Sequence, residues 1–150
     1  MRHALLAFSL IFLTHCSKPA LTVSQFHLRN SKMLSKTSPM VRAEALYRYD
    51  NNLSQKDRLQ KHGHYYVVRW DPDEIDQSSS DLKLSFKYRQ ASSGQKGKTI
   101  THFLPANSAP QYEIIINGPE YLKNGRILAW KATLSQGGEI IGTEQSFLWD

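Results

Sequence analysis

The segment from Gly125 to Asp150 constrains the fold more than any other part of the chain. Two runs rich in β-forming residues flank Gly137-Gly138, and a glycine pair between such runs is a strong signal for a β-hairpin. Period-2 alternation places the apolar residues of the first run on one face: Leu128, Trp130, Ala132 and Leu134. The corresponding face of the second run holds Ile141, Thr143, Phe147 and Trp149. A lone hairpin is marginally stable in water, so the sequence predicts a larger sheet with an opposing layer.

The strand with the clearest pattern is Asp81 to Arg89. Its apolar face comprises Leu82, Leu84, Phe86 and Tyr88, and its polar face comprises Lys83, Ser85, Lys87 and Arg89. Similar patterns or β-forming runs predict strands at 41–48, 64–70, 98–104 and 111–117. A short helix is expected between 53 and 62, because Ser54 and Asp57 have capping-box spacing and Gly63 suits the position after its end.

About seven antiparallel strands with little helix predict an all-β fold, a sandwich of two sheets. The pattern resembles the immunoglobulin and fibronectin type III class over residues 41–150, and Asn124 to Ala129 resembles the approach to its strand F. Ile127 stands where that class has its corner tyrosine, and Ala129 where it has its second disulfide cysteine. The likeness is therefore architectural. A small β-barrel is the alternative.

The first sixteen residues have the pattern of an export signal. Arg2 is followed by an apolar run from Ala4 to Leu13, about half the roughly 20 residues that a transmembrane helix needs. A buried core helix is the alternative. The run ends at Leu13-Thr14-His15-Cys16, which resembles the lipobox of bacterial lipoproteins, although the family prefers a small residue at the position of His15.

The lipoprotein resemblance implies that Cys16 is lipidated and becomes the new N-terminus. It also implies delivery to the outer membrane, facing the periplasm, because Ser17 rather than an acidic residue follows the cysteine. The expected organisation is a signal peptide at 1–15, a lipidated N-terminus and flexible tether at 16–40, and a β-sandwich at 41–150. Within the tether, the weak alternation of Leu21, Val23 and Phe26 leaves a first edge strand as an alternative.

The formal net charge of +6 arises from basic residues spread along the chain. That distribution allows weak attraction to anionic lipid or polysaccharide but is not a nucleic-acid signature. Cys16 is the single cysteine, so no internal disulfide can form. We expect a monomeric domain with no nucleic-acid partner.

Three groups of residues are candidates for chemical sites. His62 and His64 have a spacing that could hold zinc on a strand, but His102 is distant, and solvated histidines are the alternative. The alternating carboxylates of Asp71, Asp73, Glu74 and Asp76 could suit calcium, but they lack the pattern of an EF-hand loop and also fit a solvated turn. Ser146 lacks the glycines of a nucleophile elbow. The sequence therefore predicts no catalytic residue, metal site or cofactor.

Aromatic and basic side chains are the remaining candidates for recognition. The aromatic set is Tyr65, Tyr66, Trp70, Tyr88, Trp130 and Trp149, and most of it is expected in the core. A basic hairpin face comprises Lys83, Lys87, Arg89, Lys96 and Lys98, with protection of a sheet edge as the plainer explanation. The favoured hypothesis is a non-catalytic, lipid-anchored envelope protein whose sandwich acts as an interaction or accessory module. The alternative is a module for carbohydrate or anionic glycan, which a row of exposed aromatics would favour.

Overall fold

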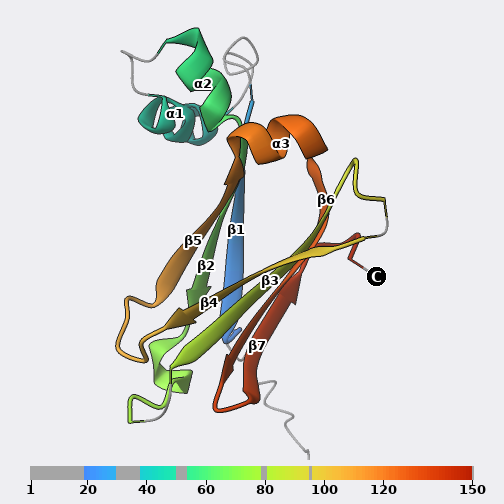
Figure 1. Ribbon diagram of the computed structural model, residues 1–150. Coiled ribbons are helices and arrows are strands. Elements are labelled where there is room, and N and C mark those ends of the chain that lie inside the picture. The colour runs from blue at the N-terminus through green and yellow to red at the C-terminus, as the bar shows by residue number, and fades with distance from the viewer. Residues whose placement is uncertain (1–18, 30–37, 50–53, 79–80, 95, 150) are drawn as a thin grey trace, which may run out of the picture.

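Two stacked antiparallel β-sheets form the body of the molecule in the computed structural model, which describes residues 19–29, 38–49, 54–78, 81–94 and 96–149. Cys16 and the predicted signal lie outside the described residues. The described part contains seven strands and three α-helices, and the helices lie together at one end of the sheets (Figure 1). The structure is mostly β, with two antiparallel sheets as the predicted sandwich requires, and it has three α-helices where one was predicted.

The two sheets differ in size. The three-stranded sheet has the order β1 (Leu21–Leu28), β2 (Gly63–Trp70) and β5 (Gln111–Asn117). The four-stranded sheet has the order β4 (Lys98–Leu104), β3 (Leu82–Gln90), β6 (Ile127–Gln136) and β7 (Glu139–Gln145). A short 3₁₀ helix, η2 (Pro72–Glu74), follows β2.

The main core lies between the sheets and is built by alternation along the strands. The predicted inward face of β3 is confirmed, because its four apolar side chains are all buried: Leu82, Leu84, Phe86 and Tyr88. They pack with Tyr66 and Val68 of β2 and Ile114 of β5. Fully burying one such side chain stabilises the fold by roughly 1.5–3 kcal/mol, so the facing strands hold the two layers together.

Strand β1 lies inside the segment that was expected to be a tether. Each of its residues pairs with β2, from Leu21 opposite Trp70 to Leu28 opposite Gly63. The Asp71 backbone N–H also donates to the Ala20 carbonyl at 3.1 Å. Of the two interpretations of this segment, the edge strand is the one found at 21–28, because buried leucines at both ends outweigh its polar middle.

Helix α1 (Pro39–Arg48) replaces the strand that was predicted at 41–48. Ser38 caps the helix, with its hydroxyl 3.5 Å from the Val41 N–H, and Pro39 occupies the first turn. The alternating pattern was misleading because alanine, glutamate, leucine and arginine are good helix formers, and in α1 only Ala45 is buried.

Helix α2 (Gln55–Lys61) confirms the predicted short helix and its cap. The Ser54 hydroxyl accepts the Asp57 N–H at 3.2 Å and donates to the Asp57 carboxylate at 2.7 Å. Gly63 follows the C-cap, and a Cβ there would lie 2.3 Å from the Ile116 carbonyl oxygen of β5, which excludes a larger residue. Helix α3 (Gly118–Asn124), with a proline in its first turn, was not predicted.

The organising hairpin forms as expected, but its face assignment holds only in part. Trp130, Ala132 and Leu134 are buried, whereas Leu128 is 40% exposed. A register shift opposite Arg89 and Gln90 changes the phase of β6, so the side chain next to Leu128, that of Ile127, is buried instead. At the other end, β7 stops at Gln145, and Phe147 beyond it is 95% exposed rather than part of an inner face.

A second, smaller core lies on the outer side of β2. Tyr65 packs there with Leu28, Ala45 and Tyr49, while Tyr66 faces the main core. The two tyrosines of β2 therefore both belong to cores, one on each side of the strand. Strand β2 has no wet face at this point, because α1 supplies Ala45 to cover it.

Candidate functional site

The most concentrated group of titratable rings is a pair of stacked histidines beside the helical end. His27 of β1 lies opposite His64 of β2, with ring centroids 3.9 Å apart and an angle of 16° between the ring planes. Tyr121 of α3 contacts both rings edge-on at 5.6 and 5.9 Å. We call His27, His64 and Tyr121 the histidine stack.

Hydrogen bonds fix the rings of the histidine stack. Arg29 Nε–H donates to His27 Nδ1 at 3.0 Å, so His27 carries its proton on Nε2, which lies 2.8 Å from the Tyr121 hydroxyl. The Ile127 backbone N–H donates to His64 Nε2 at 3.3 Å. Gln25 Nε2 lies 3.2 Å from His64 Nδ1. All four ring nitrogens therefore have a neighbour within the fold.

Burial keeps both histidines neutral. The pKa of His64 falls from 6.5 to about 3, through desolvation first and then through its electrostatic interactions with His27, Arg29 and Arg126. The pKa of His27 falls to about 4, again through desolvation first and then through the nearby cations. Such weak bases take up no second proton at neutral pH, so each ring keeps a single N–H and no charge. With their nitrogens engaged, we interpret the stack as a structural layer rather than a catalytic one.

The structure separates the histidines that were considered for zinc. His62 is the C-cap of α2 and lies outside the strand, whereas His64 is buried in β2. The two histidines therefore do not share a strand face, as the zinc hypothesis required. They are not a pair of solvated histidines either, because His64 is buried. His102 lies on β4, with Nδ1 3.0 Å from the Tyr112 hydroxyl. No cluster of three or more potential metal ligands occurs among the residues that the structure describes.

The acidic residues after β2 organise turns. The Asp71 carboxylate accepts the Asp73 N–H at 3.3 Å, which caps η2. The Asp76 carboxylate accepts the N–H and the hydroxyl of Ser78, at 2.9 and 2.7 Å, and these bonds lower its pKa. Ser146 also has a structural position: its hydroxyl accepts the Trp130 N–H at 2.9 Å. These carboxylates accept hydrogen bonds within an exposed turn and are not directed at a common metal position.

Most of the candidate recognition aromatics belong to the core. Five of the six are buried: Tyr65, Tyr66, Trp70, Tyr88 and Trp130. Trp149 is partly exposed and lies beneath the Arg89 guanidinium at 5.2 Å. The most exposed rings are instead those of Tyr47, Phe103 and Phe147, which lie on α1, on β4 and after β7. Since β4 and β7 are opposite edges of the four-stranded sheet and α1 lies at its helical end (Figure 1), these rings do not form one row.

The basic hairpin divides into groups with different surroundings. Lys98 forms an ion pair with Glu120 of α3, and Arg89 donates to the carbonyls of Leu148 and Trp149, each at 2.8 Å. Lys83 and Lys87 remain exposed on the outer face of β3. Since β3 is an inner strand of its sheet, edge protection does not explain these two lysines.

Arg48 organises a surface that the sequence analysis missed. Its guanidinium lies 3.9 Å from the centre of the Tyr65 ring and bonds Glu44 at 2.7 Å and Glu113 at 2.5 Å. Hollows of about 370 and 410 Å³ flank it. This surface was missed because the sequence pattern predicted a strand at 41–48, and the one signal for a helix there was the capping residue Ser38.

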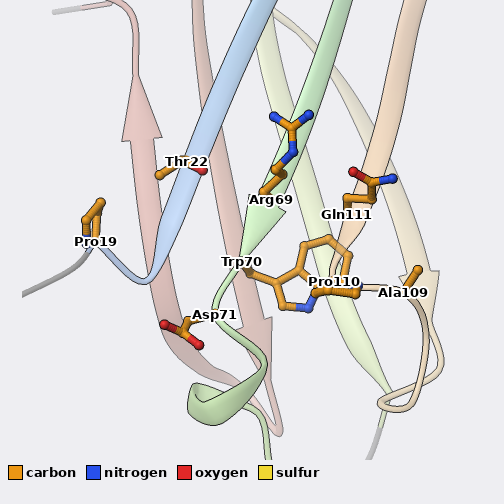
Figure 2. Close-up of a pocket in the computed structure, with 8 residues that line it drawn as sticks. All are labelled: Pro19, Thr22, Arg69, Trp70, Asp71, Ala109, Pro110 and Gln111. Atoms are coloured by element: carbon orange, nitrogen blue, oxygen red, sulfur yellow. The ribbon is translucent and has the colours of Figure 1, made fainter.

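A third hollow lies at the end opposite the helices, where β1 begins. It has a volume of about 460 Å³ and is lined by Pro19, Arg69, Trp70 and Pro110 among others. Figure 2 shows the Trp70 ring next to Pro110, and the Trp70 backbone N–H donates to the Pro110 carbonyl at 3.2 Å. This hollow is the described feature nearest in sequence to Cys16.

Comparisons with known protein families, characterised proteins and solved structures find no match to the chain. Within the described ranges, none of the helices is long and apolar enough to cross a bilayer.

Proposed function

We propose that this chain is a lipid-anchored, non-catalytic protein of the bacterial cell envelope whose β-sandwich acts as an interaction module. Cys16 carries the lipid, and the outer membrane is the destination that Ser17 implies. Strand order supports the fibronectin type III variant of the sandwich, because β4 pairs with β3 instead of lying beside β5 as in an immunoglobulin constant domain.

The observation that carries this proposal is the position where the folded domain begins. Strand β1 starts at Leu21, and the bond between Asp71 and Ala20 extends the ordered contact by one residue. Cys16 precedes Pro19 by three residues, which reach at most roughly 10 Å when extended. An anchor at Cys16 therefore places this end of the sandwich beside the membrane and the three helices at its far end (Figure 1).

The non-catalytic part of the proposal is supported by how the histidine stack is used. Its ring nitrogens contact Gln25, Arg29 and Tyr121 and a backbone N–H, so the two imidazoles fix β1, β2 and α3 relative to one another. The aromatic-row version of the carbohydrate hypothesis is disfavoured, because five of its six rings are buried. Recognition of an anionic glycan by charge is supported by the open face of the larger sheet, considered below.

The anchor is tested by replacing Cys16 with serine. We expect Cys16→Ser protein to leave the membrane fraction or to keep its signal, because two or more acyl chains are needed for stable anchoring and serine cannot carry them through a thioether. Cell fractionation with mass spectrometry of the mature N-terminus measures both effects, and Ser17→Ala is the matched control. Cys16→Ser protein that is still processed and membrane-bound would refute the anchor.

A further inference from the structure

We propose that the outer face of the four-stranded sheet binds an anionic polysaccharide, using Lys83, Lys87 and Lys131. This inference rests on the interaction-module proposal and names the partner of that module. We call these three residues the lysine face. They come from two neighbouring strands, β3 and β6, of the sheet that Figure 1 shows without a helix across it.

Strand register sets the composition of this surface. The outward residues of β3 from Lys83 to Lys87 pair with Thr99, Thr101 and Phe103 on β4, and with Lys131, Thr133 and Ser135 on β6. Thr133 pairs in turn with Thr143 of β7. These positions combine ammonium groups with hydroxyl groups and include no carboxylate.

Lys87 and Lys131 are direct cross-strand partners. Side chains at opposed positions have Cβ atoms about 4.5–5.5 Å apart, and like charges placed there repel each other. The other residues paired with these two lysines are Thr99 and Gln145, so no acid in the ladder offsets that repulsion. An anion bound between the two ammonium groups would offset it, so the arrangement favours a negatively charged partner.

The surrounding side chains favour a glycan over other polyanions. Hydroxyl groups that can donate and accept hydrogen bonds match a polymer of hydroxyls and carboxylates. Single-stranded nucleic acid binds on rows of stacking rings, and a protein partner uses a buried apolar centre. On this face Phe103 is the one ring among the paired positions, and it lies on the edge strand β4.

Charge at the opposite end disfavours the membrane itself as the partner. The turn after β2 carries Asp71, Asp73, Glu74 and Asp76, and it lies at the end where Pro19 and β1 begin. With an anchor at Cys16, this acidic turn is held beside anionic head groups and repelled by them. The sheet is thereby kept upright, so its lysine face points parallel to the membrane plane rather than onto the lipid.

The proposal is tested on the protein purified in detergent, whether or not its signal has been removed, with polygalacturonate oligomers as the anionic probe and dextran as the neutral one. We expect the chain to bind polygalacturonate but not dextran, with a slope of log K against log salt of about −2 for three lysines. The triple variant Lys83→Gln, Lys87→Gln, Lys131→Gln should weaken binding by about tenfold or more. Its melting temperature should stay level or rise, since a like-charge pair is removed.

The matched control removes the same charge from the helical end: Lys56→Gln, Arg58→Gln, Lys123→Gln. These residues are exposed in α2 and α3, and we expect their loss to change binding by less than about twofold. Equal losses in both triple variants would overturn the proposal, as would absence of polygalacturonate binding. Tighter binding to oligothymidylate, an acidic peptide or phosphatidylglycerol vesicles would also overturn it. Because the assay does not depend on lipidation, its failure is distinguishable from failure of the anchor.

Discussion

Trp130→Ala is expected to destabilise the domain by about 3–5 kcal/mol, the typical loss on truncating a buried tryptophan. Trp130 is 7% exposed and stacks on Phe86 at 5.9 Å, with Tyr66 edge-on at 5.6 Å. Its indole N–H donates to the Gln25 side-chain oxygen at 3.2 Å. The substitution thus leaves a cavity between the sheets and an unpaired amide. Urea unfolding followed by circular dichroism measures the loss, a large share of the roughly 5–15 kcal/mol of an ordinary domain.

The control for Trp130 is its neighbour Lys131, whose side chain lies on the outer face. Lys131→Ala should change the free energy of unfolding by less than about 0.5 kcal/mol, as is usual at a surface position. If Trp130→Ala unfolds like the parent and loses only partner binding, the ring is a recognition residue and the carbohydrate hypothesis gains.

Acidification from pH 6.5 to 5 is expected to lower the free energy of unfolding by about 2 kcal/mol through His64 alone. The unfolded chain takes up a proton near pH 6.5, whereas the folded pKa of His64 is lowered to about 3 and that of His27 to about 4. The contribution of the two histidines to the free energy of unfolding is therefore fully present above pH 6.5 and is lost as the pH falls toward 4 and 3. His27 adds a smaller amount because it is only half-buried.

Urea titrations at several pH values measure this dependence. The double variant His27→Gln, His64→Gln should be less stable at pH 7 but should show a flatter dependence between pH 6.5 and 5. His102→Gln removes a histidine of β4 that lies outside the stack and is expected to keep the parental slope. A double variant as steep as the parent would show that other groups cause the acid sensitivity.

The strands were predictable wherever one face meets the core and the other meets water. Strand β3 is the clearest case, since Lys83 and Lys87 alternate with buried Leu84 and Phe86. The cap of α2 was equally readable, because Ser54 and Asp57 interact within a few residues. In both cases the signal is local, so no knowledge of the fold was needed.

The failures occur where distant segments decide the outcome. Strand β1 is polar in its middle and is fixed by pairing with β2, which begins at Gly63, 42 residues after the start of β1 at Leu21. Tyr65 is buried because α1 covers it, and the sequence pattern predicted a strand where α1 lies. The exposure of Leu128 follows from a register shift that depends on the partner strand.

The candidate sites were less predictable than the fold. His64 was singled out, but its partner His27 was not, because the stack exists only through the pairing of β1 with β2. Likewise, Lys131 joins Lys87 only across the ladder of β3 and β6, so the sequence showed two of the three residues of the lysine face. Cys16 remains a prediction from the signal pattern and lies outside the described residues.

The ladder between β1 and β2 determines how the domain carries mechanical load. Its pairs run continuously from Leu21 to Leu28, and the hydrogen bonds of an antiparallel ladder lie perpendicular to the strands. A force applied to the chain at Pro19 and directed away from the helices acts along β1. It therefore shears the whole ladder at once instead of peeling one pair at a time. A partner held on the larger sheet could pull against an anchor at Cys16, and the eight paired residues of β1 would share the tension.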